Sequence, residues 1–144
     1  MLYHTLLLLH IIGACIWVGG HLILSLQIVP KASANKDINL ILNFEKHFEP
    51  IGIPSLVIQI ITGVWMAIFQ YGIQFNWDNA IQRNIILKLS LLVLSLLLAL
   101  HARIFIIPKL SLVNLPMMVL HIRFITLVAL LMVFFGLQFR FGGL

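Results

Sequence analysis

Apolar residues form four long stretches along the chain, at about residues 2–29, 51–71, 85–107 and 117–139. A helix needs about 20 apolar residues to cross the hydrocarbon core of a bilayer, so each stretch can form one membrane span. Pro30, Pro108 and Pro116 mark three of the ends, and Pro54 is expected in the first turn of the second span. The pattern predicts an all-α, integral membrane four-helix bundle that takes up residues 1–144 as a single domain.

Composition agrees with this class, because 62% of the residues are hydrophobic, 9% are charged and the mean hydropathy is +1.12. Soluble domains carry about a quarter of charged residues, so a soluble enzyme is excluded. The net charge is +5, but the basic residues stand singly at the ends of the apolar stretches. We therefore expect the lipid bilayer as a partner and no nucleic acid.

Lysine and arginine gather in two of the three connections between spans. The first connection holds Lys31, Lys36 and Lys46, and the third holds Lys109 with Arg103 close by. Because short cytoplasmic loops are enriched in these residues, we expect connections one and three in the cytoplasm. Both termini would then lie outside the cytoplasm. We expect the membrane to be a bacterial inner membrane.

The first connection has a helical pattern of its own at residues 37–49. Ile41 and Phe48 share one face, and the lysines lie on the other. This pattern predicts a short amphipathic surface helix between the first and second spans. Glu45 and Glu49 fall near Ile41, on the buried side; the alternative is an i,i+4 carboxylate pair at the membrane surface.

Histidine is the most informative polar residue, because ionisable groups are costly inside a membrane. His21, His101 and His121 each lie about 7–14 Å from the span end that adjoins a basic connection. Three helices thus bring imidazoles to one inner layer. His10 lies about 16 Å from His21 along the first helix, in an outer layer. The alternative is neutral rings that only hydrogen-bond neighbouring helices.

Other residues could complete a metal site in the inner layer. Met117 and Met118 precede His121 by four and three residues, and a thioether beside imidazole suits Cu(I), although methionine is also a common gap filler. Histidine with the carboxylates Glu45 and Glu49 would instead suit zinc or iron. The candidate metal ligands are His21, His101, His121, Glu45, Glu49 and Met117.

The first helix carries a stripe that consists of His10, Gly13, Trp17, Gly20 and His21 within an arc of about 100°. The two glycines allow one of two things: close packing of a neighbouring helix, or space for a flat ligand such as a porphyrin.

Three motifs resemble the copper resistance D (CopD) family. The segment from His10 to His21, HIIGACIWVGGH, is similar to its first-helix signature of histidine, tryptophan and paired glycines. Ile61-Thr62-Gly63 resembles its second-helix TG motif. Leu87-Lys88-Leu89, then Ala102-Arg103 and Ile107-Pro108-Lys109-Leu110, resemble its third helix. The resemblance implies a four-helix membrane domain linked with copper uptake or resistance.

The HemJ-type protoporphyrinogen oxidases are related to that family, and they bind haem b through a first-helix histidine and carry a third-helix lysine. His10 and Lys88 match those positions. On this resemblance, the candidate cofactor-binding residues are His10, Gly13, Trp17, Gly20 and Lys88.

Three functions remain open from the sequence. The first is a metal-handling membrane protein, with copper favoured by the resemblance and zinc or iron as alternatives. The second is a haem b oxidoreductase or electron carrier, and the third is a structural subunit. A homodimer or homo-oligomer is expected, because four short helices barely enclose a macrocycle and offer a pore only as an oligomer. The sequence identifies no catalytic residue.

Overall fold

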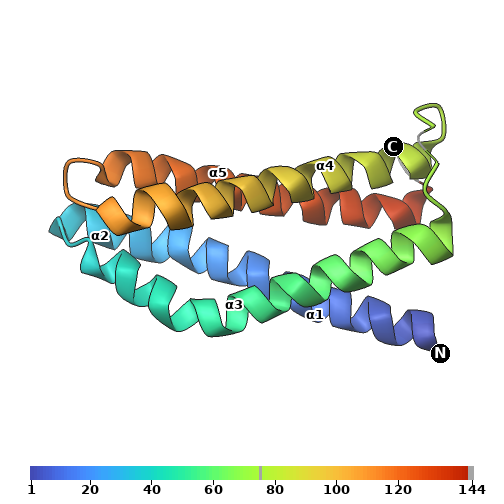
Figure 1. The fold of residues 1–144 in the computed structure, drawn as a ribbon, viewed down its shortest axis with the longest axis horizontal. Coiled ribbons are helices and arrows are strands. Elements are labelled where there is room, and N and C mark those ends of the chain that lie inside the picture. The colour runs from blue at the N-terminus through green and yellow to red at the C-terminus, as the bar shows by residue number, and fades with distance from the viewer. Residues whose placement is uncertain (75, 143–144) are drawn as a thin grey trace.

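The computed structural model describes residues 1–74 and 76–142, which form four long helical rods (Figure 1). The first rod consists of α1 (Leu2–Ile23), the π-helical turn η1 (Leu24–Ile28) and α2 (Val29–Asn35), and the second of α3 (Asn39–Met66) and the π-helical turn η2 (Ala67–Tyr71). The third consists of α4 (Ala80–His101), the π-helical turn η3 (Ala102–Ile106) and the 3₁₀ turn η4 (Ile107–Lys109), and the fourth of α5 (Leu115–Gln138) and the 3₁₀ turn η5 (Phe139–Phe141).

All four rods are long and apolar enough to cross a membrane: Leu2–Asn35, Asn39–Tyr71, Ala80–Lys109 and Leu115–Phe141. Large apolar side chains point away from the bundle on every rod, with Leu26 72% exposed and Leu120 70% exposed. So much outward apolar surface suits lipid and not water. The prediction of an all-α integral membrane four-helix bundle is confirmed.

The sequence predicts that the first helix ends at Pro30, and this prediction is wrong because the helix continues past it. The π-helical turn η1 precedes it directly, and the N–H of Val29 bonds the carbonyl of Leu24. A wider turn relieves the clash between a proline ring and the preceding carbonyls, and membrane helices use such local adjustments at proline. The rod therefore continues through α2 to Asn35, and Lys36 caps it with a left-handed backbone (φ +53°).

The segment predicted as a separate surface helix forms the first turns of α3 instead. α3 begins at Asn39 and runs without interruption through Pro50 and Pro54 to Met66. Pro54 thus lies inside a helix and not in its first turn. The predicted faces of the segment hold, since Ile41 is buried and Lys46 is exposed.

The rods associate as two pairs, with α1 packed along α3 and α4 along α5, and α1 also contacts α5 (Figure 1). Both termini lie at one end of the bundle. The turns between α2 and α3 and between η4 and α5 lie at the other end. We call this second end the basic end, because the predicted basic connections are there.

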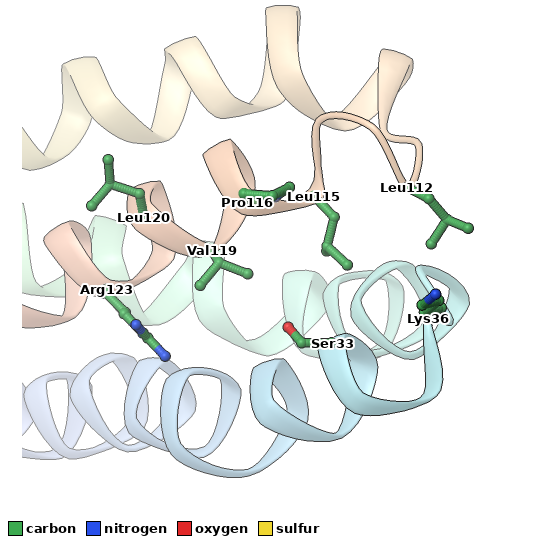
Figure 2. A pocket seen from close by; sticks show the side chains of 8 residues that line it. All are labelled: Ser33, Lys36, Leu112, Leu115, Pro116, Val119, Leu120 and Arg123. Atoms are coloured by element: carbon green, nitrogen blue, oxygen red, sulfur yellow. The ribbon is translucent and has the colours of Figure 1, made fainter.

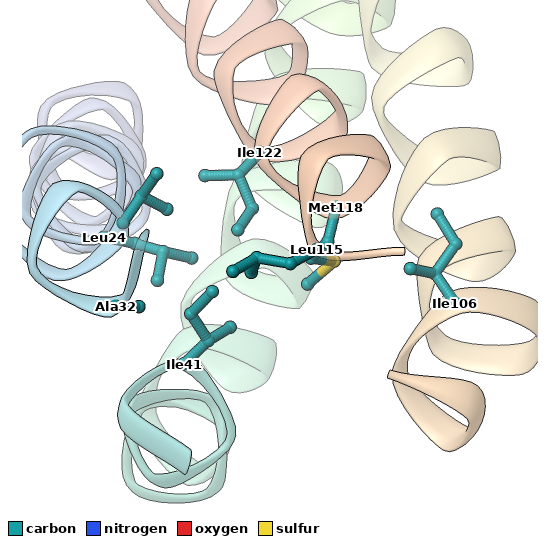
Figure 3. Close-up of a cluster of buried hydrophobic side chains, with 8 residues drawn as sticks. Leu24, Ala32, Ile41, Ile106, Leu115, Met118 and Ile122 are labelled. Carbon is teal, nitrogen blue, oxygen red and sulfur yellow. The ribbon is translucent and has the colours of Figure 1, made fainter. Parts of the chain in front are cut away.

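A buried apolar cluster closes the basic end of the bundle (Figure 3). Its members come from all four rods: Leu24, Val29, Ala32, Ile41, Ile106, Leu115, Met118 and Ile122. In a water-soluble protein, burying a valine, leucine, isoleucine or methionine side chain stabilises the fold by roughly 1.5–3 kcal/mol. In a membrane, the same residues act through close packing. The cluster holds the four rods in place beneath the cavity described next.

Candidate functional site

A cavity of about 410 Å³ lies among α1, α3, α4 and α5, directly against the buried cluster of the basic end. Its polar lining consists of His21, Glu45, Glu49, Arg103 and His121. The rest of its wall is apolar or aromatic. A mostly apolar cavity with a few convergent polar groups is the usual form of a ligand site.

His21 enters the cavity wall from α1 with a fixed orientation. Its Nδ1 donates a hydrogen bond to the backbone carbonyl of Trp17, one turn earlier, at 3.0 Å. A carbonyl only accepts, so in the neutral ring Nε2 keeps a lone pair. The imidazole packs against the Trp17 ring, at 4.5 Å between centroids, and against Phe48 at 6.2 Å. These contacts hold His21 in place with one nitrogen free to bind a ligand.

His121 enters from α5 in the complementary arrangement. Its Nε2 donates to the carbonyl of Leu98 on α4 at 2.7 Å. In the neutral ring Nδ1 therefore carries the lone pair. A histidine whose other nitrogen bonds a backbone carbonyl is the common form of a metal ligand in proteins.

Two carboxylates line the cavity from α3, and they differ in their partners. Arg103 on η3 donates to Glu49, with 2.6 Å between Nη1 and Oε2. Glu45 lies one turn earlier, and in the described part of the chain it has no hydrogen-bond or ion-pair partner. Glu45 is thus the carboxylate available to a cation.

His101 and Met117 do not line the cavity. The His101 side chain is exposed, and its ring lies beside His121, at 5.4 Å between centroids, and beside Phe105. Met117 is 58% exposed, whereas Met118 is buried and lines the cavity. Within residues 1–74 and 76–142, no three histidine, cysteine, aspartate or glutamate side chains lie close enough to hold one metal ion. The predicted inner layer is thus two histidines and two carboxylates around one cavity, and not a preformed metal centre.

The predicted outer layer is a helix contact between α1 and α3. His10 Nδ1 donates to the carbonyl of Gln59 at 3.1 Å and lies 3.0 Å from the Thr62 hydroxyl. Its ring lies against Gly63, where an added Cβ would approach the ring to 2.9 Å. His10 therefore joins two helices, as in the hydrogen-bonding alternative.

The glycines of the α1 stripe are covered by α3. A Cβ on Gly13 would lie 2.9 Å from the carbonyl oxygen of Ser55, and one on Gly20 would overlap the Phe48 ring. Of the two alternatives for these glycines, the structure shows close packing. A flat ligand along this stripe would have to displace α3.

Lys88 lies in the N-terminal half of α4, with Nζ 5.6 Å from the centre of the Phe139 ring. Asn84, one turn earlier, is fully buried, and neither atom of its amide group has a hydrogen-bond partner among the described residues. Sequence reasoning did not identify Asn84, because a single asparagine near a helix start is an ordinary feature.

Sequence reasoning also missed Arg103 and Phe48 as parts of the cavity. In the sequence, Arg103 stands as a basic residue close to the third connection, although its charge is opposite to that of Glu49. Phe48 lies where Cβ atoms on Gly20 and on Gly52 would both meet its ring. This pairing of small residues with one aromatic ring joins α1 to α3 and forms part of the cavity wall.

The fold and the cavity define an integral membrane protein built as a four-helix bundle with a polar site near one end. Residues 42–137 match the family model described as Copper resistance protein D, and the chain belongs to this family. The matched segment includes Glu45, Glu49, Arg103 and His121 and begins after α1, so His21 lies outside it. The chain matches no curated protein and no solved structure.

Proposed function

We propose that this protein takes part in copper handling, in uptake or resistance, and that it binds a transition-metal ion in the cavity among α1, α3, α4 and α5. The family description names copper resistance and favours copper. One observation carries the proposal: two imidazoles, each with one nitrogen bonded to a backbone carbonyl and the other free, line the same cavity as Glu45.

The proposed ligands are Nε2 of His21, Nδ1 of His121 and a carboxylate oxygen of Glu45. Neutral imidazole suits copper, zinc and iron alike, and the Glu45 carboxylate alone would favour zinc or iron, so the preference for copper rests on the family description. Because no three such groups in the described residues are within reach of one ion, the proposal includes rotation of the unpartnered Glu45 side chain toward the two imidazoles as the ion enters.

The remaining predicted ligands have lesser parts in this proposal. Glu49 is already neutralised by Arg103. His101 lies beside His121 but outside the cavity, and Met117 points away from it.

The test is metal retention by the full chain purified in detergent. The protein is loaded separately with Cu(I) under reducing conditions, Zn(II) and Fe(II), and bound metal is measured by elemental analysis after gel filtration. We expect copper in a near one-to-one ratio with the chain. The double variant His21→Ala with His121→Ala is expected to lose more than tenfold in affinity, since even outer-shell changes cost about 10–100-fold.

The matched control is His4→Ala with His47→Ala. Both histidines are exposed and outside the cavity, and His47 bonds the carbonyl of Asn43 in its own helix. The control should retain copper like the unaltered protein. Equal retention by the cavity variant and the control would refute the metal site, and stronger retention of zinc or iron would refute copper as its ion.

We further propose that the basic end faces the cytoplasm of a bacterial inner membrane, and that the chain works as a homodimer or homo-oligomer. The lysines of the connections support the orientation. It is tested by replacing Cys15 with alanine and placing single cysteines at Ser33 or Asp78. A membrane-impermeant maleimide applied to intact cells should label only the cysteine at 78; labelling at 33 would show the opposite orientation.

Native mass spectrometry measures the oligomeric state. A spectrum that contains monomers alone would refute the proposed homodimer or homo-oligomer.

A further inference from the structure

A second hollow, of about 730 Å³, lies on the outside of the bundle between α2 and the first half of α5 (Figure 2). We call it the basic groove. Its apolar wall consists of Leu112, Leu115, Pro116, Val119 and Leu120, and its polar residues are Ser33, Lys36 and Arg123. Both charged residues of this lining are cations, and no acidic side chain belongs to it.

Arg123 lies on the outer face of α5, within the apolar span. It shares that face with Leu120, Phe124 and Leu127, which are 70%, 45% and 52% exposed. Among the described residues, Arg123 has no ion-pair or hydrogen-bond partner, and Arg103 with Glu49 is the ion pair found there. A cation at such a position is costly in lipid unless it meets an anion or reaches the interface.

Lys36 is at the other end of the groove, where α2 stops. Its φ of +53° is in the left-handed region that favours glycine or asparagine. The chain carries a lysine there despite that conformational cost. Figure 2 shows Lys36 and Arg123 toward opposite ends of the lining, with Ser33 between them.

We propose that the basic groove binds the phosphate headgroup of an anionic phospholipid, with an acyl chain along the apolar wall. Arginine pairs with phosphate through two parallel hydrogen bonds, and lysine acts as a point charge. Arg123 lies eight residues into α5, or about 12 Å along its axis. A long side chain spans part of that depth by snorkelling toward the headgroups. Basic pockets between transmembrane helices are a known form of lipid headgroup site.

The test measures binding to the full chain in detergent by native mass spectrometry. It compares two lipids that differ only in headgroup, and a phosphate compound without acyl chains. The probes are phosphatidylglycerol, phosphatidylcholine with the same acyl chains, and glycerol phosphate without chains. We expect phosphatidylglycerol to bind more tightly than phosphatidylcholine. Glycerol phosphate should not compete at the same concentration, because it lacks the apolar contact.

The variants are Arg123→Gln, Lys36→Gly and the pair together. Glycine suits the left-handed position, so Lys36→Gly removes the charge without disturbing the turn, and its melting temperature should not fall. Each change should weaken phosphatidylglycerol binding about fivefold, and the pair about 25-fold, at roughly 1 kcal/mol per basic residue. Binding of phosphatidylcholine should weaken less, because the choline cation already balances the charge of its phosphate. Lys46→Gln, at an exposed lysine outside the groove, is the control and should change neither.

Several results would overturn the proposal. Equal phosphatidylglycerol affinity in the double variant and the unaltered chain would show that the lipid does not bind in the basic groove. Equal affinity for the two lipids would show that the groove does not select an anionic headgroup. Competition by glycerol phosphate alone would show that the groove binds free phosphate and not a lipid. A change of oligomeric state without a change of lipid affinity would make the groove a contact between copies of the chain. None of these outcomes depends on the copper site.

Discussion

Arg103 and Glu49 form an ion pair of 2.6 Å that joins η3 to α3 across the partly exposed side of the cavity. The side chains are 57% and 32% exposed. An ion pair at that exposure contributes about 0.2–1 kcal/mol to stability. Its main effect is therefore to compensate the charge of Glu49, which leaves Glu45 as the carboxylate without a partner.

A double-mutant cycle with Arg103→Gln and Glu49→Gln should give a coupling energy below about 1 kcal/mol. Unfolding in mixed detergent measures the four free energies of unfolding. Arg140→Gln, at an exposed arginine with no ion pair among the described residues, serves as the control and should be neutral. A coupling of several kcal/mol would show that the pair is buried in the membrane and holds the bundle together.

Gly13→Ala should destabilise the bundle, because the added Cβ would meet the backbone oxygen of Ser55 at 2.9 Å. Overpacking of this kind costs about 1–3 kcal/mol. Gly19→Ala is the matched control in the same helix, since no atom of the described residues lies within 4 Å of its added Cβ. The control should be neutral or stabilising by up to about 1 kcal/mol. Equal melting temperatures for the two variants would argue against close packing of α1 on α3.

Asn84→Leu should raise the free energy of unfolding or leave it unchanged. The amide of Asn84 is fully buried without a partner among the described residues, and such an orphaned group costs about 1–3 kcal/mol. Leucine has the same branched arrangement of four side-chain heavy atoms and carries no polar group that needs a partner. Asn43→Leu, at an exposed position of α3, is the comparison. A clear loss of stability in Asn84→Leu alone would show that the amide has a partner, such as a bound water or ion.

His101→Ala should change copper affinity by less than about twofold, although the His101 ring touches that of His121. His121→Ala should lower the affinity more than tenfold under the same conditions. The reason is that His121 lines the cavity and His101 does not. Equal losses in both variants, measured by competition with a copper chelator, would restore the three-histidine layer predicted from the sequence.

The four membrane-spanning helices could be predicted from the length of the apolar stretches, and the buried face of residues 37–49 could be predicted from their helical periodicity. The same reasoning placed Glu45 and Glu49 on the inner side of their helix, and both do line the cavity. His21 and His121, which were expected at one depth, both line the cavity. These are properties of single helices, which a helical wheel represents well.

The remaining features depend on contacts between helices. His101 has the same depth as His121, but depth does not show which way a helix is rotated within the bundle. The continuation past Pro30 depends on the π-helical turn η1, which no motif indicates. The choice between packing and open space beside Gly13 required the position of α3. The depth of each polar residue along its helix can therefore be predicted from the sequence. Which of these residues contact one another depends on how the helices pack.

X-ray absorption at the copper K-edge tests the central claim most directly, because it counts the imidazoles on the bound ion. The unaltered chain loaded with one equivalent of Cu(I) should show the scattering of two imidazoles. His21→Ala and His121→Ala should each show one, and His47→Ala should still show two. A spectrum without imidazole scattering, or one that stays the same in both cavity variants, would contradict a copper site formed by His21 and His121.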